Sequence, residues 1–193
     1  DGKSPCDFIP NRKTIYSEYN DWSPKNSNGK YEGKYSLVGA LTNSINTVSV
    51  HLCMQSGIKN VIAYAEELGI TDSLPEVPSI ALGVSNISLK NMIAAYGTFA
   101  NNENYIKPNT ITAIYNKEKQ LIFELKIESH SIIEQEIAQD ITNMLRSVVD
   151  NGTVKRLRYK YKLQGAIAGK TGTTQNHSDG WFIGYSPEWL GGV

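Results

Sequence analysis

"GAIAGKTGTTQNHSDGWFIGY", residues 165–185, contains the most informative motif of the sequence. Its apolar start leads into Gly169-Lys170-Thr171, which are also the letters of a phosphate-binding loop. That loop requires G-x-x-x-x-G-K-[ST] running directly into a helix, whose first N–H groups hold the phosphate. Here the preceding glycine, Gly165, is one residue too close, and turn-forming residues follow in place of a helical pattern. The stretch therefore predicts a strand and argues against a nucleotide site.

In an extended strand, side chains alternate between two faces. Lys170, Gly172 and Thr174 would then face one way, and Thr171 and Thr173 the other. A ligand can lie against the backbone of a glycine, the N–H that follows can stabilise an oxyanion, and threonine hydroxyls with a lysine can hold a carboxylate. This arrangement suits acyl transfer on a substrate with a free carboxylate. A hairpin edge with an incidental lysine is the alternative at this point.

A second polar element interrupts an apolar helical stretch, "SLVGALTNSINTVSVHL". Ser44 and Asn46 lie two residues apart in the break between two predicted helices. Both side chains can point into a cleft from such a position. The alternative is a polar pair that caps the second helix.

The remaining pattern predicts helices first and strands later. A basic run, 155–163, alternates with apolar residues and reads as a strand with one charged face. The expected helices, from their periodicity and caps, are 37–42, 48–55, 58–69, 89–102 and 131–152, with a hairpin over 109–126. This order favours an α+β fold, an antiparallel sheet flanked by helices. We expect 1–35 to be an irregular loop region, 36–152 mainly helical with one hairpin, and 153–193 the active-site strands.

Composition excludes several classes of protein. A formal net charge of zero argues against a nucleic-acid partner, which a cationic excess would indicate. No apolar run reaches the ~18 residues that a membrane-spanning helix needs. The three histidines lie far apart without metal-ligand spacing, so we predict neither a metal site nor a cofactor. Of the two cysteines, Cys53 lies in an apolar run and is expected to be a buried free thiol.

The two motifs together resemble a known family. Penicillin-binding proteins and serine β-lactamases carry S-x-x-K, S-x-N and K-T-G in that chain order. "YSLVGALTNSINTVSVHL", "PSIALGVSNISLKNMIAAYGTFAN" and "AGKTGTTQNHSDGWFIGYSP" resemble the transpeptidase domain of class A (bifunctional) penicillin-binding proteins. Thr174 and residues 179–187 favour class A over class B. The resemblance covers 22–193 and implies a β-lactamase/transpeptidase-like fold, present here as the C-terminal part of a single domain.

The family's nucleophile, the serine of S-x-x-K, has no suitable match here. Ser27 begins one such string, in a Gly/Asn turn that would not place serine and lysine on one helical face. Ser56 begins another, after S-x-N and at the expected N-cap of the third helix. The family places S-x-x-K several tens of residues before S-x-N. We therefore expect the nucleophile upstream of Asp1, and this fragment to be inactive alone.

The resemblance also implies residue roles. Ser44 would relay a proton toward the leaving nitrogen with help from Lys170, and Asn46 would bind the substrate amide carbonyl. Thr171 and Thr173 would hold the terminal carboxylate, and the Thr173 N–H would form half of the oxyanion hole. The predicted catalytic residues are Ser44, Asn46 and Lys170, and the predicted substrate-binding residues are Thr171, Gly172, Thr173 and Thr174.

Implied partners are peptidoglycan stem peptides ending in D-Ala-D-Ala, which the parent protein would crosslink, and β-lactam antibiotics. The parent would be anchored at the periplasmic face of the bacterial inner membrane, behind an upstream glycosyltransferase domain. The fragment would expose apolar surface and could self-associate. The alternatives are a D,D-carboxypeptidase or β-lactamase of the same fold, and a β-lactam-recognising sensor or pseudoenzyme.

Overall fold

The N-terminal region carries more regular structure than its composition indicates. The computed structural model describes residues 2–173 and 180–193. Strand β1 (Phe8–Pro10) pairs antiparallel with β2 (Lys34–Ser36), and the short 3-10 helix η1 (Ser17–Tyr19) lies between them in sequence. The loop between η1 and β2 contacts the helical region that follows, where Asn26 Oδ1 accepts a hydrogen bond from the Thr47 N–H.

Within the described residues seven helical segments follow, most of them where the periodicity predicts. They are α1 (Leu37–Asn43), α2 (Asn46–Ser56), α3 (Ile58–Glu67), η2 (Pro78–Leu82), α4 (Leu89–Ala100), α5 (Gln135–Asn151) and α6 (Arg156–Tyr159). Serine side chains cap two of these helices: the Ser36 hydroxyl accepts from the Gly39 N–H at the start of α1, and the Ser88 hydroxyl from the Asn91 N–H at the start of α4, each at 3.2 Å. Ser56 does not cap α3 as expected, because α2 continues through it and Gly57 takes the cap position.

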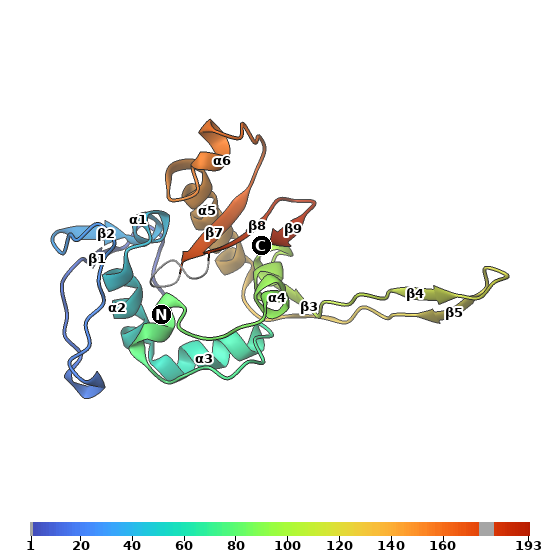
Figure 1. The fold of residues 1–193 in the computed structure, drawn as a ribbon, viewed down its shortest axis with the longest axis horizontal. Helices are drawn as coiled ribbons and strands as arrows, with labels where there is room; N and C mark the ends of the chain where they lie inside the picture. Colours follow the sequence, from blue (N-terminus) through green and yellow to red (C-terminus); the bar gives the residue numbers. More distant parts are fainter. Residues whose placement is uncertain (1, 174–179) are drawn as a thin grey trace.

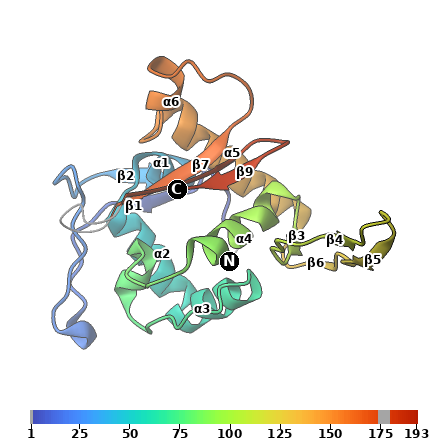
Figure 2. The same ribbon diagram turned by 45° about the vertical axis from the view of Figure 1, so that its right-hand side comes forward.

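The main sheet has three antiparallel strands in the order β7 (Ala168–Thr173), β8 (Gly180–Tyr185) and β9 (Leu190–Gly192). Two apolar clusters join β7 and β8 to α5: Leu145 packs with Ala168 and Tyr185, and Val148, Val149 and Val154 pack with Ile167 and Phe182. The sheet passes between α6 and α4 (Figure 2), and α5 lies against β7 (Figure 1). The predicted α+β fold with an antiparallel sheet flanked by helices is confirmed.

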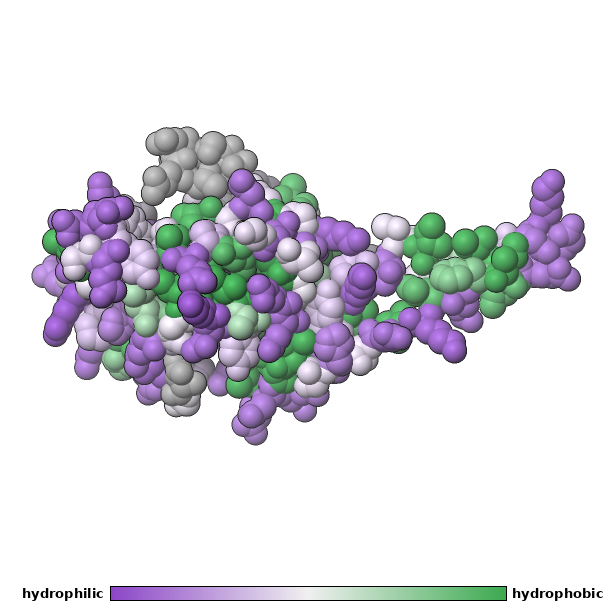
Figure 3. All heavy atoms as spheres, turned by 90° about the horizontal axis from the view of Figure 1, so that it is seen from below, coloured by the Kyte–Doolittle hydropathy of each residue, from purple (hydrophilic) through white to green (hydrophobic). Residues whose placement is uncertain are grey.

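The predicted hairpin is present as β4 (Ala113–Tyr115) and β5 (Leu121–Glu124). It projects from the body of the molecule (Figure 1), and its apolar residues form the green arm of Figure 3. At its base, β3 (Asn104–Ile106) pairs with β6 (Ser129–Ser131). This pairing corrects the start of the long helix, which was expected at residue 131. The backbone of 129–131 joins a ladder, and the helix begins at Gln135.

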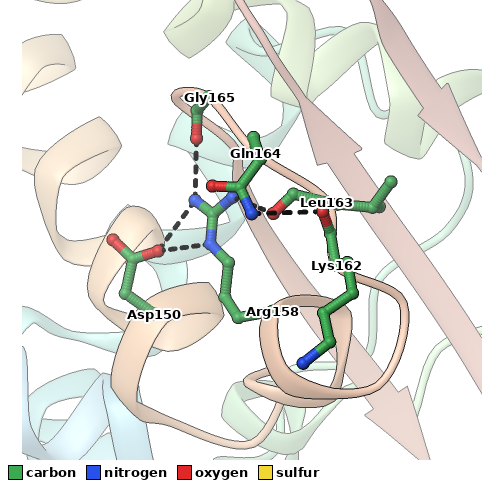
Figure 4. Close-up of polar contacts among 6 residues, drawn as sticks. All are labelled: Asp150, Arg158, Lys162, Leu163, Gln164 and Gly165. Atoms are coloured by element: carbon green, nitrogen blue, oxygen red, sulfur yellow. Dashed lines mark hydrogen bonds and ion pairs between the residues drawn. The ribbon is translucent and has the colours of Figure 1, made fainter.

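The prediction of a strand over 155–163 is wrong, because residues 156–159 form the short helix α6. Val154 is 5% exposed and its carbonyl accepts from the Leu157 N–H, so a helical turn packs these two residues against the end of α5. The other apolar residues of the run, Tyr159, Tyr161 and Leu163, stay exposed. The Arg158 guanidinium donates to Asp150 Oδ1, the Leu163 carbonyl and the Gly165 carbonyl, each at 2.8 Å (Figure 4). A planar five-donor group suits such a fork. Arg158 thus fastens the segment leading into β7 to α5.

Two smaller findings concern the cysteines and the helices. Cys53 is buried and not bonded to Cys6, as expected. None of the helices among the described residues has the length and apolar composition that crossing a bilayer requires.

Candidate active site

The break between α1 and α2 is made by one residue in the left-handed region. Ser44 has φ 54° and ψ 55° and ends α1, with its N–H directed at the carbonyls of Ala40 and Leu41. Ile45 follows in an extended conformation and is 2% exposed, packed with Val48. Asn46 then begins α2. The apolar residue at the centre of S-x-N therefore anchors the break in the core, and the two polar residues on either side stay half-buried at its surface.

Lys170 joins this break to the sheet. Its Nζ donates to Ser44 Oγ at 3.1 Å and to the Thr171 carbonyl at 3.0 Å. The lower end of β7 reaches the junction of α1 and α2 in Figure 1. Two motifs 126 residues apart in sequence are thus in direct contact.

The charge on Lys170 is only partly compensated. The ion pairs within residues 2–173 and 180–193 are Lys59–Glu76 and Arg158–Asp150, so no carboxylate of that part of the chain pairs with Lys170. Burial disfavours the ammonium form and lowers the pKa of Lys170 from its ordinary value of 10.5. An anionic ligand placed beside it would therefore meet a positive charge that lacks a counter-ion there.

The strand after Lys170 presents hydroxyls and an open backbone. Thr171 Oγ1 lies 3.5 Å from Thr153 Oγ1, and Thr171 lines the same cleft as Lys170. Gly172 and Thr173 are exposed, and a Cβ at Gly172 would meet only the Trp181 Cβ, at 3.8 Å. The backbone at Gly172 is thus accessible to a ligand. Thr174, predicted to bind substrate, lies outside the described residues.

A cleft of about 500 Å³ opens beside this strand. One wall is formed by β7 and β8, with Lys170 at its polar edge, and the facing wall by α4 and the loop after η2. The lining residues are Leu82, Gly83, Val84, Ser85, Asn86, Ile87, Met92, Tyr96, Lys170, Thr171, Gly172, Thr173, Trp181 and Ile183. The cleft is therefore mostly apolar, and its polar side chains come from K-T-G-T on one wall and from Ser85 and Asn86 on the other.

Asn46, the last residue of S-x-N, is bonded to the N-terminal region. Its Nδ2 donates to the Lys25 carbonyl at 2.7 Å. Sequence reasoning missed this partner, because a backbone carbonyl leaves no signal in residue identity. It also missed Thr153, whose place after Gly152 at the end of a helix gave no reason to put it beside the K-T-G strand. No group of three His, Cys, Asp or Glu side chains in the described ranges is placed to hold a metal ion.

The left-handed backbone of Ser44 predicts a stability difference between two variants. Ser44→Gly and Ser44→Ala both lose the hydroxyl, but only alanine keeps the Cβ that the left-handed region disfavours. We expect the glycine variant to be more stable by about 0.5–1 kcal/mol, after allowing for the larger backbone entropy of unfolded glycine. Urea denaturation of the two variants measures this difference. An alanine variant at least as stable as the glycine variant would contradict the argument.

The lowered pKa of Lys170 predicts a pH dependence of stability. Because burial disfavours the charged amine, the unfolded chain holds this proton to higher pH than the folded chain. The free energy of unfolding of the unaltered protein should therefore rise relative to Lys170→Met as pH increases from the lowered pKa toward 10.5. Below that window the difference should be constant. Denaturation curves of both proteins between pH 7 and pH 11 test this, and a difference that does not change with pH would refute it.

Comparisons with known proteins identify the family of this chain. The family model described as penicillin binding protein transpeptidase domain matches residues 7–190. The chain is 34% identical over 178 residues to penicillin-binding protein 1A of Clostridium novyi and 35% identical over 177 residues to that of Aquifex aeolicus. These matches cover 90% and 92% of this chain but 21% and 24% of those proteins. The chain thus spans about a fifth to a quarter of the curated relatives it matches.

Solved structures show the same fold. Penicillin-binding protein 1A from Haemophilus influenzae matches with a TM-score of 0.87 at 20% identity, over 94% of this chain and 33% of that one. PonA1 from Mycobacterium tuberculosis, in complex with penicillin V, matches with a TM-score of 0.80 at 21% identity, over 99% of this chain and 54% of that one. The resemblance that S-x-N and K-T-G indicated is confirmed, and the chain belongs to the family of penicillin-binding protein transpeptidase domains.

Proposed function

We propose that this chain is part of a serine-type D,D-transpeptidase that crosslinks peptidoglycan stem peptides through an acyl-serine intermediate. The observation that carries the proposal is the hydrogen bond from Lys170 Nζ to Ser44 Oγ. It places a cation, a hydroxyl that can relay a proton and the K-T-G strand around one point. Those are the groups that acyl transfer on a carboxylate-bearing peptide requires.

The nucleophile is supplied by residues outside these 193. Ser27 is exposed in a turn closed by a hydrogen bond from the Gly29 N–H to the Asn26 carbonyl, with no helix to present it. Ser56 ends α2 at the far end from Asn46, about 15 Å away along the helix axis. Neither serine is in a position to act with Ser44 and Lys170. The 193 residues alone are therefore inactive in this proposal.

The apolar cleft is the seat of the helix that carries S-x-x-K. Met92, Tyr96 and Ile183 offer a hydrophobic surface, while Lys170 and Thr173 lie at its polar edge. A helix that buried an apolar stripe against those residues would bring the serine at its N-terminal end to that edge. Its N-terminal N–H groups would add to the positive potential there.

The reaction then proceeds in two steps. The serine oxygen attacks the carbonyl of the penultimate D-Ala, and the Thr173 N–H stabilises the oxyanion. The C–N bond to the terminal D-Ala breaks, and its nitrogen takes the proton that the attacking serine gives up, relayed through Ser44 with help from Lys170. In the second step the amine of a neighbouring stem peptide attacks the ester, and the serine is released with its proton.

Substrate recognition falls to the remaining site residues. Asn46 has two amide N–H groups, of which one is given to Lys25, so the other can serve the substrate carbonyl. The hydroxyls of Thr171 and Thr173 hold the terminal carboxylate beside Lys170, with Thr174 as a further ligand. β-Lactams acylate the same serine because they present the same carbonyl and carboxylate. The parent protein carries an upstream glycosyltransferase domain and works at the outer face of the bacterial inner membrane.

Intact mass after incubation with penicillin tests the proposal. The full-length protein should gain one covalent adduct, mapped by peptide digestion to a serine of an S-x-x-K string upstream of these residues. The 193-residue chain should gain none. An adduct on Ser27, Ser44 or Ser56 would disprove the proposed origin of the nucleophile. No adduct on folded full-length protein would disprove the transpeptidase assignment, and rapid hydrolysis of the adduct would favour a β-lactamase.

A further inference from the structure

The start of α2 is capped by a residue from a distant loop. Ile45 occupies the N-cap position, and its apolar side chain accepts no hydrogen bond from the first helical turn. The Asn26 Oδ1 accepts instead from the Thr47 N–H at 3.0 Å. Asparagine is among the best N-cap residues because its short side-chain oxygen reaches these donors. Here that oxygen arrives from 21 residues earlier in the chain.

Asn26 is itself held by a buried network. It is 6% exposed, and its Nδ2 donates to Asn11 Oδ1 at 2.9 Å and to the Lys30 carbonyl at 2.7 Å. Asn11 is fully buried and donates to the carbonyls of Lys30 and Glu32, each at 3.2 Å. The Thr47 hydroxyl closes the ring with a 2.6 Å bond to Asn11 Oδ1. A buried polar network whose members are all hydrogen-bonded fixes one geometry, because any other leaves a polar group unpaired.

The same loop also orients the S-x-N asparagine directly. The Lys25 carbonyl, one residue before Asn26, accepts from Asn46 Nδ2 at 2.7 Å. The loop therefore contacts two consecutive residues of α2: the side chain of Asn46, and the backbone and side chain of Thr47. Ser44 lies two residues before Asn46, in the left-handed conformation that sets the break.

We propose that Asn26, supported by Asn11, is the positioning residue of the S-x-N motif. By capping α2 and fixing the Lys25 carbonyl, it sets the direction in which Ser44 and Asn46 face Lys170. This inference rests on the proposed function, since a positioning role has meaning only at a working site. A misplacement of about 1 Å at a catalytic group can cost about a hundredfold in rate, so a cap outside the site can control the chemistry.

The test is the second-order rate of acylation of the full-length protein by penicillin. Asn26→Ala removes the acceptor of the Thr47 N–H and leaves Asn11 Oδ1 with fewer donors. We expect acylation to slow by about tenfold or more. Asn91→Ala is the matched control, because Asn91 also pins a loop to a helix, through Asp72 Oδ2 at 2.8 Å, but away from S-x-N. The control should lose thermal stability and acylate within about twofold of the unaltered rate.

A double-mutant cycle with Asn46→Ala separates positioning from general destabilisation. If Asn26 acts through the S-x-N motif, Asn26→Ala should slow acylation by much less in the Asn46→Ala background than in the unaltered protein. An undiminished effect in that background would overturn the positioning role. Thr47→Val, which keeps the side-chain volume and deletes the hydroxyl, serves if Asn26→Ala does not fold. It should slow acylation in the same direction and by less, and an unchanged rate would count against the network.

Failure of the inference and failure of the proposed function have different signatures. Acylation of the unaltered protein, with Asn26→Ala reacting at the same rate, would overturn the positioning role alone. Absence of acylation in the folded unaltered protein would overturn the proposed function and this inference with it.

Discussion

The hydrogen bond between Lys170 and Ser44 is the contact on which the site depends. Two elements with no relation in sequence, the α1–α2 break and β7, meet through it. Each end is held by its own apolar packing: Ile45 lies in the core beneath the break, and Ala168 packs with Leu145 and Tyr185 beneath the strand. The polar contact therefore joins two hydrophobic clusters at their surface.

Both residues of this contact lower the stability of the fold. Lys170 is removed from water without a carboxylate partner in the described part of the chain, so its charge carries a desolvation cost. Ser44 adds a left-handed backbone that a non-glycine residue adopts at a cost in free energy. Such costs are characteristic of residues kept for chemistry. Apolar burial around α5 and β7 and the polar network of Asn11, Asn26 and Thr47 offset them.

The elements that follow a periodic pattern or carry a side-chain cap could be predicted from the sequence. Helices 37–43 and 89–100 could be predicted because Ser36 and Ser88 mark their starts, and the K-T-G strand because glycines and alternation exclude a helix. Sequence reasoning failed over 155–163, where a short alternation imitated a strand and the deciding contacts, from Arg158 to two carbonyls and Asp150, are tertiary. The hydrogen bond by which Asn26 caps α2 at Thr47 could not be predicted either, since no local sequence pattern links the two residues. The motifs of the site were predictable, and what holds them in place was not.

The most direct test of the central claim is a crystal structure of the full-length protein acylated by penicillin. We expect the acylated serine to sit on a helix that fills the cleft along Met92 and Tyr96, within hydrogen-bond distance of Ser44 or Lys170. The penicillin carboxylate should accept hydrogen bonds from the hydroxyls of Thr171 or Thr173. An acyl-serine bound elsewhere, with the Lys170–Ser44 contact intact and the cleft unfilled, would contradict the claim.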